Sequence, residues 1–222
     1  GGLGNDTIRG RGGVDVLDGG AGTDTLDYLE ATLGVTVDLA GGTTSNDGDG
    51  AFDTISNFEN VIGSTNDDNI TGDALDNILD GDAGNDILAG GAGDDTLDGG
   101  AGTDTVTYQN AASGIVANLF GGTVSNDGDG GTDTLTAIEN ITGSGFDDVI
   151  DGDNSANTLS GGAGDDILQG RGGADVLDGG TGTDAADYSL ASGSVIADLL
   201  GGFATNDGSG NSDTFISIEN LI

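Results

Sequence analysis

The sequence predicts an all-β solenoid in which short parallel strands follow one another in stacked coils. Three observations carry this prediction. A nine-residue pattern recurs through much of the chain, each copy holds one large aliphatic residue at a fixed place, and 47 of the 222 residues are glycine while none is proline. This composition is unlike that of an ordinary globular domain. A short repeat of this kind is typical of a solenoid, in which each copy packs against its neighbours.

Two periods are nested in the sequence. Beside the nonapeptide there is a longer period, which places equivalent residues such as Tyr28, Tyr108 and Tyr188 at equal intervals without insertion or deletion. We expect one continuous solenoid of three nonapeptide blocks (1–27, 63–107 and 143–187) and three inserts with wider, metal-poor coils, the last of them truncated (28–62, 108–142 and 188–222). The chain starts and stops inside this pattern, so we expect it to be part of a longer protein.

Each nonapeptide is predicted to form a tight turn of six residues and a strand of three. Glycines at the first, second and fourth places permit positive backbone angles and close approach of carbonyl groups. The middle strand residue points to one side and its neighbours to the other. Two nonapeptides then make one flattened coil, and stacked coils form two parallel sheets over a single file of middle residues: Ile8, Leu17, Leu26, Ile70, Leu79, Leu88, Leu97, Val106, Ile150, Leu159, Leu168, Leu177 and Ala186.

Such a narrow core predicts that a ligand is needed for folding. One aliphatic side chain per nine residues buries little apolar surface, whereas ordering nine glycine-rich residues costs conformational entropy. Charge repulsion adds to the deficit, because 40 acidic residues face only three arginines and the formal net charge is −37. A multivalent cation is the natural counter-charge.

The charge and the missing residue types also exclude function classes. Nucleic acid and membrane surfaces attract basic proteins, so neither is an expected partner. The chain has no cysteine and no histidine, which removes disulfides and the usual zinc, copper and nickel ligands. It also has no lysine, and its carboxylates are periodic rather than grouped in one unusual site, so we expect no enzymatic activity.

The sixth place of the nonapeptide supplies the predicted cation ligands. Turns two nonapeptides apart lie on the same edge of the coil, about 4.8 Å apart. An ion midway between them is about 2.4 Å from each, within the range of calcium–oxygen bonds, and magnesium fits less well because it keeps its water. The candidate ligands are Asp6, Asp15, Asp24, Asp68, Asn77, Asp86, Asp95, Asp104, Asp148, Asn157, Asp166, Asp175 and Asp184, together with main-chain carbonyl groups of the glycine-rich turns.

The nonapeptides resemble a known family. The runs GGAGDDTLD, GGAGTDTVT and GGAGDDILQ are similar to the RTX, or haemolysin-type, calcium-binding repeat. This resemblance implies a parallel β-roll or β-helix solenoid with calcium ions in the Gly-rich turns, in bacterial proteins exported by type I secretion. It implies about seven calcium ions, with turn carbonyls at Gly2, Gly4, Gly20, Gly22, Gly84, Gly91, Gly93, Gly100, Gly102, Gly162, Gly164, Gly173, Gly180 and Gly182. At position 82 the repeat calls for another glycine, but the chain has Asp82, so no glycine ligand is assigned there.

Some repeats depart from the pattern. GRGGVDVLD and GRGGADVLD place Arg11 and Arg171 second, where a carbonyl rather than the side chain would be the ligand. GSTNDDNIT and GSGFDDVID have few glycines, and GDALDNILD and GDNSANTLS carry Asn77 and Asn157 in place of the carboxylate. We expect calcium sites that involve these last four repeats to be weaker or lost.

The inserts raise separate alternatives. The loop at 45–53 could bind calcium through Asp47, Asp49 and Asp53, or it could be a solvated acidic turn; it is not an EF-hand, since Phe58 stands where the twelfth-place glutamate is needed. Asp53, Asp133 and Asp213 look like displaced sixth-place aspartates. The tyrosine that ends each nonapeptide block is expected to pack over the last coil. Glu59, Glu139 and Glu219 are expected to hydrogen-bond to neighbouring backbone, with a calcium-ligand role open.

Two functions fit these expectations. In the first, the chain is an extracellular structural spacer of an adhesin or surface-layer protein that folds and stiffens on calcium. In the second, it is the calcium-triggered folding and secretion module of an exported enzyme or toxin. Other copies of the solenoid, or a cell-surface or polysaccharide ligand, are candidate partners, and membrane insertion is not expected.

Overall fold

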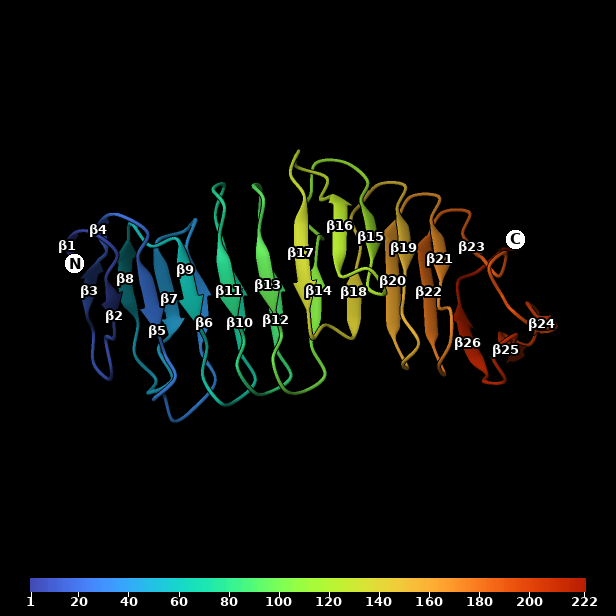
Figure 1. The fold of residues 1–222 in the computed structure, drawn as a ribbon, viewed down its shortest axis with the longest axis horizontal. Coiled ribbons are helices and arrows are strands. Elements are labelled where there is room, and N and C mark those ends of the chain that lie inside the picture. Colours follow the sequence, from blue (N-terminus) through green and yellow to red (C-terminus); the bar gives the residue numbers. More distant parts are fainter. The chain divides into compact units, whose positions relative to one another are not determined.

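A computed structural model describes residues 1–222, which form 27 strands and no helix. The structure therefore has no helix that could cross a membrane. The chain divides into two compact units, one of residues 1–106 with 133–138 and the other of residues 107–132 with 139–222. In each unit the strands run side by side in two long, open sheets, with tight turns at both ends of the strands (Figure 1).

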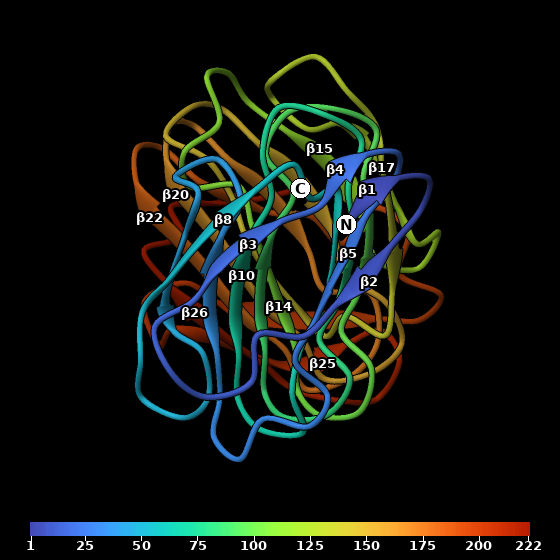
Figure 2. The ribbon, with the colours of Figure 1, turned by 90° about the vertical axis from the view of Figure 1, so that its left-hand side faces the viewer.

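The first unit is built almost entirely from strands of two to four residues. One sheet has the order β14-β12-β10-β6-β7-β8-β3 and the other the order β2-β5-β9-β11-β13-β17, while β1 pairs with β4. Figure 2 shows β3, β8 and β10 on one side of this unit and β2 and β5 on the other. The strands are β1 Gly2–Leu3, β2 Thr7–Ile8, β3 Val16–Asp18, β4 Gly20–Ala21, β5 Thr25–Asp27, β6 Thr36–Asp38, β7 Thr43–Asn46, β8 Asp53–Ser56, β9 Asn60–Ile62, β10 Asn69–Thr71, β11 Ile78–Asp80, β12 Ile87–Ala89, β13 Thr96–Asp98, β14 Thr105–Thr107 and β17 Asp133–Thr136.

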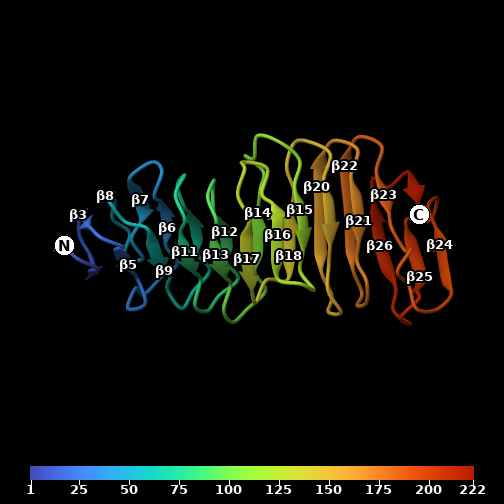
Figure 3. The same ribbon diagram turned by 45° about the horizontal axis from the view of Figure 1, so that its top comes forward.

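The second unit has the same construction. Its sheets have the orders β24-β25-β26-β22-β20-β18 and β16-β15-β19-β21-β23-β27. Figure 3 shows the last antiparallel strands of this unit, β24 and β25, beside the C-terminus. The strands are β15 Val116–Asn118, β16 Thr123–Asn126, β18 Asn140–Thr142, β19 Val149–Asp151, β20 Thr158–Ala163, β21 Ile167–Gln169, β22 Val176–Thr181, β23 Ala185–Ala186, β24 Val195–Asp198, β25 Phe203–Asp207, β26 Asp213–Ile216 and β27 Asn220–Leu221.

The predicted parallel β-roll is confirmed by the strand register. In the nonapeptide blocks each strand pairs in parallel with the strand two nonapeptides later, as where Ile70 lies beside Leu88 and Leu79 beside Leu97. The middle residues of these strands form the core, and Leu79, Leu88, Leu159 and Leu168 among them are fully buried. A core one side chain wide therefore runs through each unit between its two sheets.

The inserts continue the stack and add a hairpin to it. In the first insert, β8 and β9 continue the parallel stacks on β3 and β5. In the sheet that contains β8, β6 and β7 form an antiparallel hairpin that lies between β8 and β10. The strand β7 also pairs antiparallel with β8. The insert thus adds a hairpin to one sheet only, and its side chains Val35, Val37, Ile55, Phe58 and Val61 are buried beside the aliphatic file.

Candidate metal centre

Glycines at the second and fourth places of the nonapeptide allow the chain to form its tight turns. At the second and fourth places the backbone angle φ is positive, as at Gly91 (+99°) and Gly93 (+123°), which few side chains tolerate. Of the predicted turn glycines, only Gly102 lacks a positive φ; there a Cβ atom would lie 1.6 Å from the carbonyl oxygen of Gly84, so close backbone approach requires glycine instead. Positive φ is found at Gly2, Gly4, Gly20, Gly22, Gly84, Gly91, Gly93, Gly100, Gly162, Gly164, Gly173, Gly180 and Gly182.

Position 82 departs from this glycine pattern, and a glycine assignment there is wrong because the residue is Asp82. Its backbone still has a positive φ of 68°, as a glycine at the second place would. The N–H of Asp82 donates to Asp80 Oδ1 (3.0 Å), and its carbonyl oxygen accepts the N–H of Ala101 (2.8 Å). The turn therefore keeps its shape with an aspartate at this place, and the strain of the positive φ is borne by a non-glycine residue.

Seven of the sixth-place aspartates connect two turns with one of their carboxylate oxygens. The Oδ1 atom accepts a hydrogen bond from the main-chain N–H of the sixth residue two nonapeptides earlier. The donor–acceptor distance is 2.7 Å from Asp68 to Asp86 and 2.8 Å from Asp86 to Asp104. The same bond joins Asp6 to Asp24, Asn77 to Asp95, Asp148 to Asp166, Asn157 to Asp175 and Asp166 to Asp184. The structure thus places the predicted partners next to one another.

The second oxygen of these carboxylates is buried without a hydrogen bond. This is the case for Oδ2 of Asp6, Asp24, Asp86, Asp166, Asp175 and Asp184. Burial raises the pKa of Asp86 to about 7 and that of Asp166 to about 6, and neighbouring aspartates add to the shift. A buried carboxylate oxygen without a partner is costly, so each one needs a cation or a proton.

The missing side chain of the first-place glycine leaves room beside this oxygen. A Cβ atom built on Gly81 would lie 2.3 Å from Asp86 Oδ2 and 2.8 Å from the carbonyl oxygen of Gly99, which belongs to the turn two nonapeptides later. Gly63 has the same surroundings, with Asp68 Oδ2 at 2.3 Å and the Gly81 carbonyl oxygen at 2.7 Å. A carboxylate oxygen and a carbonyl oxygen of the next turn therefore face the same small space.

These donors fit a calcium ion. They are all hard oxygen atoms, which calcium prefers. No group of three or more acidic side chains forms a metal cluster, so an ion here takes its ligands from paired turns and from main-chain carbonyl groups. The residues that would hold it are the sixth-place aspartates with orphaned oxygens and the carbonyl groups of the glycine turns.

In the two repeats with few glycines, GSTNDDNIT and GSGFDDVID, both oxygens of the sixth-place carboxylate accept hydrogen bonds. Asp68 accepts from the N–H of Val35 (2.7 Å) and from the N–H and Oγ–H of Ser64 (2.5 and 2.8 Å). Asp148 is held in the same way by Ile115 and Ser144. Neither oxygen of these carboxylates lacks a partner, which argues for weaker sites at these turns. Nothing in the repeat pattern predicts this role of the serines, although each stands at the second place, where a glycine is usual.

In the two repeats with asparagine at the sixth place, the side-chain amide makes hydrogen bonds through both its oxygen and its nitrogen. Asn77 accepts the N–H of Asp73 (2.8 Å) through Oδ1 and donates from Nδ2 to the carbonyl oxygen of Glu59 (3.0 Å). Asn157 makes the matching bonds with Asp153 and Glu139. The amide thus bonds to the turn before it without any ion.

The inserts provide acidic residues at the places where the nonapeptide pattern breaks. Asp53 accepts the N–H of Asp15 (2.8 Å) across the insert, as a sixth-place aspartate does across two nonapeptides. Asp133 and Asp213 occupy the same place next to Asp95 and Asp175. The expected hydrogen bond of the insert glutamate to backbone is confirmed at Glu59 and Glu219, which accept the N–H of Asp24 (2.7 Å) and of Asp184 (2.9 Å).

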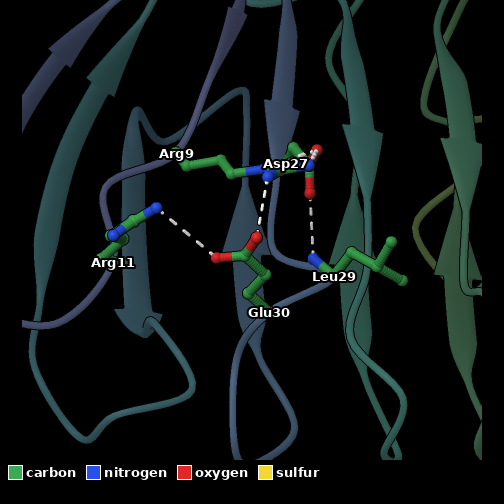
Figure 4. A network of polar contacts seen from close by, with 5 residues as sticks. All are labelled: Arg9, Arg11, Asp27, Leu29 and Glu30. Atoms are coloured by element: carbon green, nitrogen blue, oxygen red, sulfur yellow. Dashed lines mark hydrogen bonds and ion pairs between the residues drawn. The ribbon is translucent and has the colours of Figure 1, made fainter.

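The three arginines pair with acidic side chains outside the predicted ion sites. Figure 4 shows Arg9 beside Asp27 (2.7 Å) and Glu30 (3.0 Å), with Arg11 reaching Glu30 (3.6 Å). Arg171 pairs with Asp151 at 2.7 Å. Arg11 and Arg171 both have a positive φ, near +60° and +68°, so they follow the turn as the glycine at that place would.

The comparison with known families agrees with this geometry. The chain matches the RTX calcium-binding nonapeptide repeat in four copies, over residues 1–27, 71–106, 136–168 and 151–185, which together cover just over half of its length. No curated protein matches the chain. Most of the unmatched residues lie in the inserts, where the nonapeptide pattern is absent. Because the matches coincide with the turns that carry the paired aspartates, the chain belongs to the family of RTX calcium-binding nonapeptide repeat proteins.

Proposed function

We propose that this chain is a structural spacer of an extracellular adhesin or surface-layer protein, which stays unfolded at low calcium and folds at the calcium concentrations found outside cells. The observation that carries this proposal is the row of buried, unpartnered Oδ2 atoms along the turns. Those oxygens oppose folding without a cation and favour it with one. RTX repeat proteins are typically secreted, which agrees with an extracellular location.

Calcium binding and folding are then a single event. A site with a dissociation constant of about 0.1 to 1 mM contributes roughly 4 to 5.5 kcal/mol of binding free energy at a 1 M standard state. Several such sites, each shared by two turns, make the folding of neighbouring coils cooperative. About seven ions are proposed, with fewer if the serine and asparagine turns bind none.

The spacer role is favoured over a secretion module by the uninterrupted long period of the sequence. We also propose that the chain has no catalytic activity, because its carboxylates are arranged periodically and it lacks histidine, lysine and cysteine. In the longer protein, many further copies of the long repeat would support the spacer, and an adjoining hydrolase or toxin domain would support the module.

Circular dichroism during a calcium titration tests the folding switch. We expect little strand signal in chelator, a cooperative gain at millimolar calcium, and no comparable gain with magnesium at the same concentration. A strand signal that is already complete in chelator and unchanged by calcium would refute the proposal.

A further inference from the structure

We propose that the first insert holds a calcium ion, bound by Asp47 and Asp53 beside Tyr28, where the insert adjoins the nonapeptide turn of Asp15. This inference rests on the proposed function, since it assumes that calcium is the ion the folded chain takes up. It decides between the two alternatives that the sequence leaves open for the loop at 45–53, a calcium site and a solvated acidic turn.

Both carboxylates use one oxygen to order the backbone and leave the other without a partner. Asp47 Oδ1 accepts the N–H groups of Asp49 and Ala51, each at 2.9 Å, and so closes the loop between β7 and β8. Asp53 Oδ1 accepts the N–H of Asp15. Asp47 and Asp53 are only 1% and 3% exposed, and Oδ2 of each is buried with no hydrogen bond.

The two carboxylates share one neighbourhood. The main-chain N–H of Asp53 donates to Thr44 Oγ1 (3.1 Å), on the strand that leads directly to Asp47. The ring of Tyr28 is buried beside them, and the charges of Asp53 and Asp47 both act on its hydroxyl, whose pKa is raised mainly by burial. The pKa of Asp53 is also raised, first by burial and then by the charges of Asp47 and Asp15. The two buried carboxylates thus repel each other, and a cation bound to both would relieve this repulsion.

An ion can reach Asp47 from solvent. Asp47 and Tyr28 line an open cavity of about 190 Å³ whose other wall carries Arg9 and Arg11. The two guanidinium groups are turned toward Asp27 and Glu30 (Figure 4), so their charge is already neutralised. The Oδ2 atom of Asp47 has no such cationic partner.

The third insert provides a natural contrast within the second unit. Its loop reads NDGSG, where the first insert reads NDGDG. There the Oγ–H of Ser209 donates to Asp207 Oδ2 (2.7 Å), and the hydroxyl of Tyr188 donates to Asp213 Oδ2 (2.7 Å). The two oxygens that are unpartnered in the first insert are therefore both satisfied in the third, and we infer that the third insert binds no ion.

Terbium luminescence excited through tyrosine tests this site in the full chain. Terbium replaces calcium and emits strongly only when a tyrosine lies close to it, and the chain has three tyrosines and no tryptophan. In a background of Tyr108→Phe and Tyr188→Phe, Tyr28 is the remaining sensitiser. We expect strong emission that excess calcium abolishes. Asp47→Asn with Asp53→Asn should remove most of it, and calorimetry should count one calcium fewer per chain.

Two further variants separate loss of the ion from loss of the fold. The asparagine changes retain Oδ1 as an acceptor, so the loop should stay folded. Asp49→Ser offers the hydroxyl found in the third insert and should also remove the emission. The matched control, Asp207→Asn in the third insert, should change neither emission nor calcium count. The inference is overturned if emission and calcium count persist in the first-insert variants while circular dichroism shows them folded. Failure of the proposed function is separate, because the unaltered chain would then show no calcium-dependent folding.

Discussion

At the scale of single residues, the two oxygens of a sixth-place aspartate such as Asp86 have different roles. Oδ1 bonds to the backbone of the neighbouring turn and Oδ2 is left for the ion, as at Asp86. An asparagine keeps the oxygen acceptor but replaces the second oxygen with an N–H donor. Asn77 uses this donor to reach the carbonyl oxygen of Glu59 (3.0 Å). This hydrogen bond links the two turns that a calcium ion would otherwise link.

The substitution Asn77→Asp should therefore lower the stability of the folded state in chelator and raise it in calcium. In chelator the new carboxylate loses the bond to Glu59 and faces a carbonyl oxygen, so the folded state should be less stable than in the unaltered chain. In calcium the variant should bind one more ion per chain and be more stable. Calorimetry counts the bound ions, and the calcium concentration at which the strand signal appears measures the change in stability.

The control for this variant is Asn69→Asp, which adds the same charge at an exposed strand position rather than at a sixth place. It should not change the calcium count. Asn157→Asp, the equivalent turn in the second unit, should behave like Asn77→Asp. An unchanged calcium count in both turn variants would show that these turns are closed to ions for another reason.

The buried carboxylates also predict how stability depends on pH in the absence of calcium. Burial raises the pKa of Asp86 and Asp175 to about 7 and that of Asp166 to about 6, from an ordinary value of 3.8. The folded chain therefore holds protons that the unfolded chain releases, and its stability falls as pH rises from about 4 to about 7. In calcium the protons compete with the ion, so acidification should weaken binding.

Circular dichroism in chelator at pH 4.5 and pH 7.5 measures this dependence. We expect the metal-free chain to show more strand structure at the lower pH, and the calcium-loaded chain to lose calcium affinity there. A metal-free chain that is more stable at pH 7.5 would contradict the assignment of these carboxylates as buried and unpaired.

At the scale of elements, the nonapeptide is the part of the fold that the sequence predicts fully. The typical strand of the second and third blocks has its middle residue buried, as with Leu97 between the less buried Thr96 and Asp98. The turn returns the chain to the same place after two nonapeptides. Both features follow from local periodicity. The parallel sheets, the file of aliphatic residues and the pairing of aspartates can therefore be deduced from the amino-acid sequence alone.

The inserts could be predicted only in part, because their strand pairing is not periodic. The residues of GVTVDL at 34–39 alternate between apolar and polar, which predicts a strand with Val35, Val37 and Leu39 on one face. The structure has β6 there, with Val35 and Val37 buried and Leu39 partly exposed. This strand also pairs antiparallel with β7. The alternation of apolar and polar residues does not predict that pairing. The hydrogen bonds that satisfy Asp68 were equally hidden, since they come from the main-chain N–H groups of Val35 and Ser64 and from the Ser64 hydroxyl.

At the scale of the whole molecule, charge sets the conditions for folding. The formal net charge is −37, and the three arginines are already paired with acidic side chains. Seven calcium ions would neutralise about 14 of these charges, so the calcium-loaded chain stays strongly acidic. Two effects of calcium need to be separated: general screening of repulsion, which any salt provides, and coordination at the turns, which needs a divalent ion of the right size.

Sodium chloride separates these effects, because it screens charge without occupying the turns. At about 0.5 M salt the screening length is only about 4 to 5 Å, so long-range repulsion is largely removed, yet the orphaned oxygens of Asp86 and Asp166 remain buried and unpartnered in the folded state. We expect high salt in chelator to contract the unfolded chain, from a radius of gyration of about 50 Å, without producing strand signal. Millimolar calcium at low salt should produce both contraction and strands. Small-angle scattering and circular dichroism on the same samples measure the two changes, and folding driven by sodium chloride alone would show that charge repulsion, rather than the unoccupied turn ligands, keeps the chain unfolded.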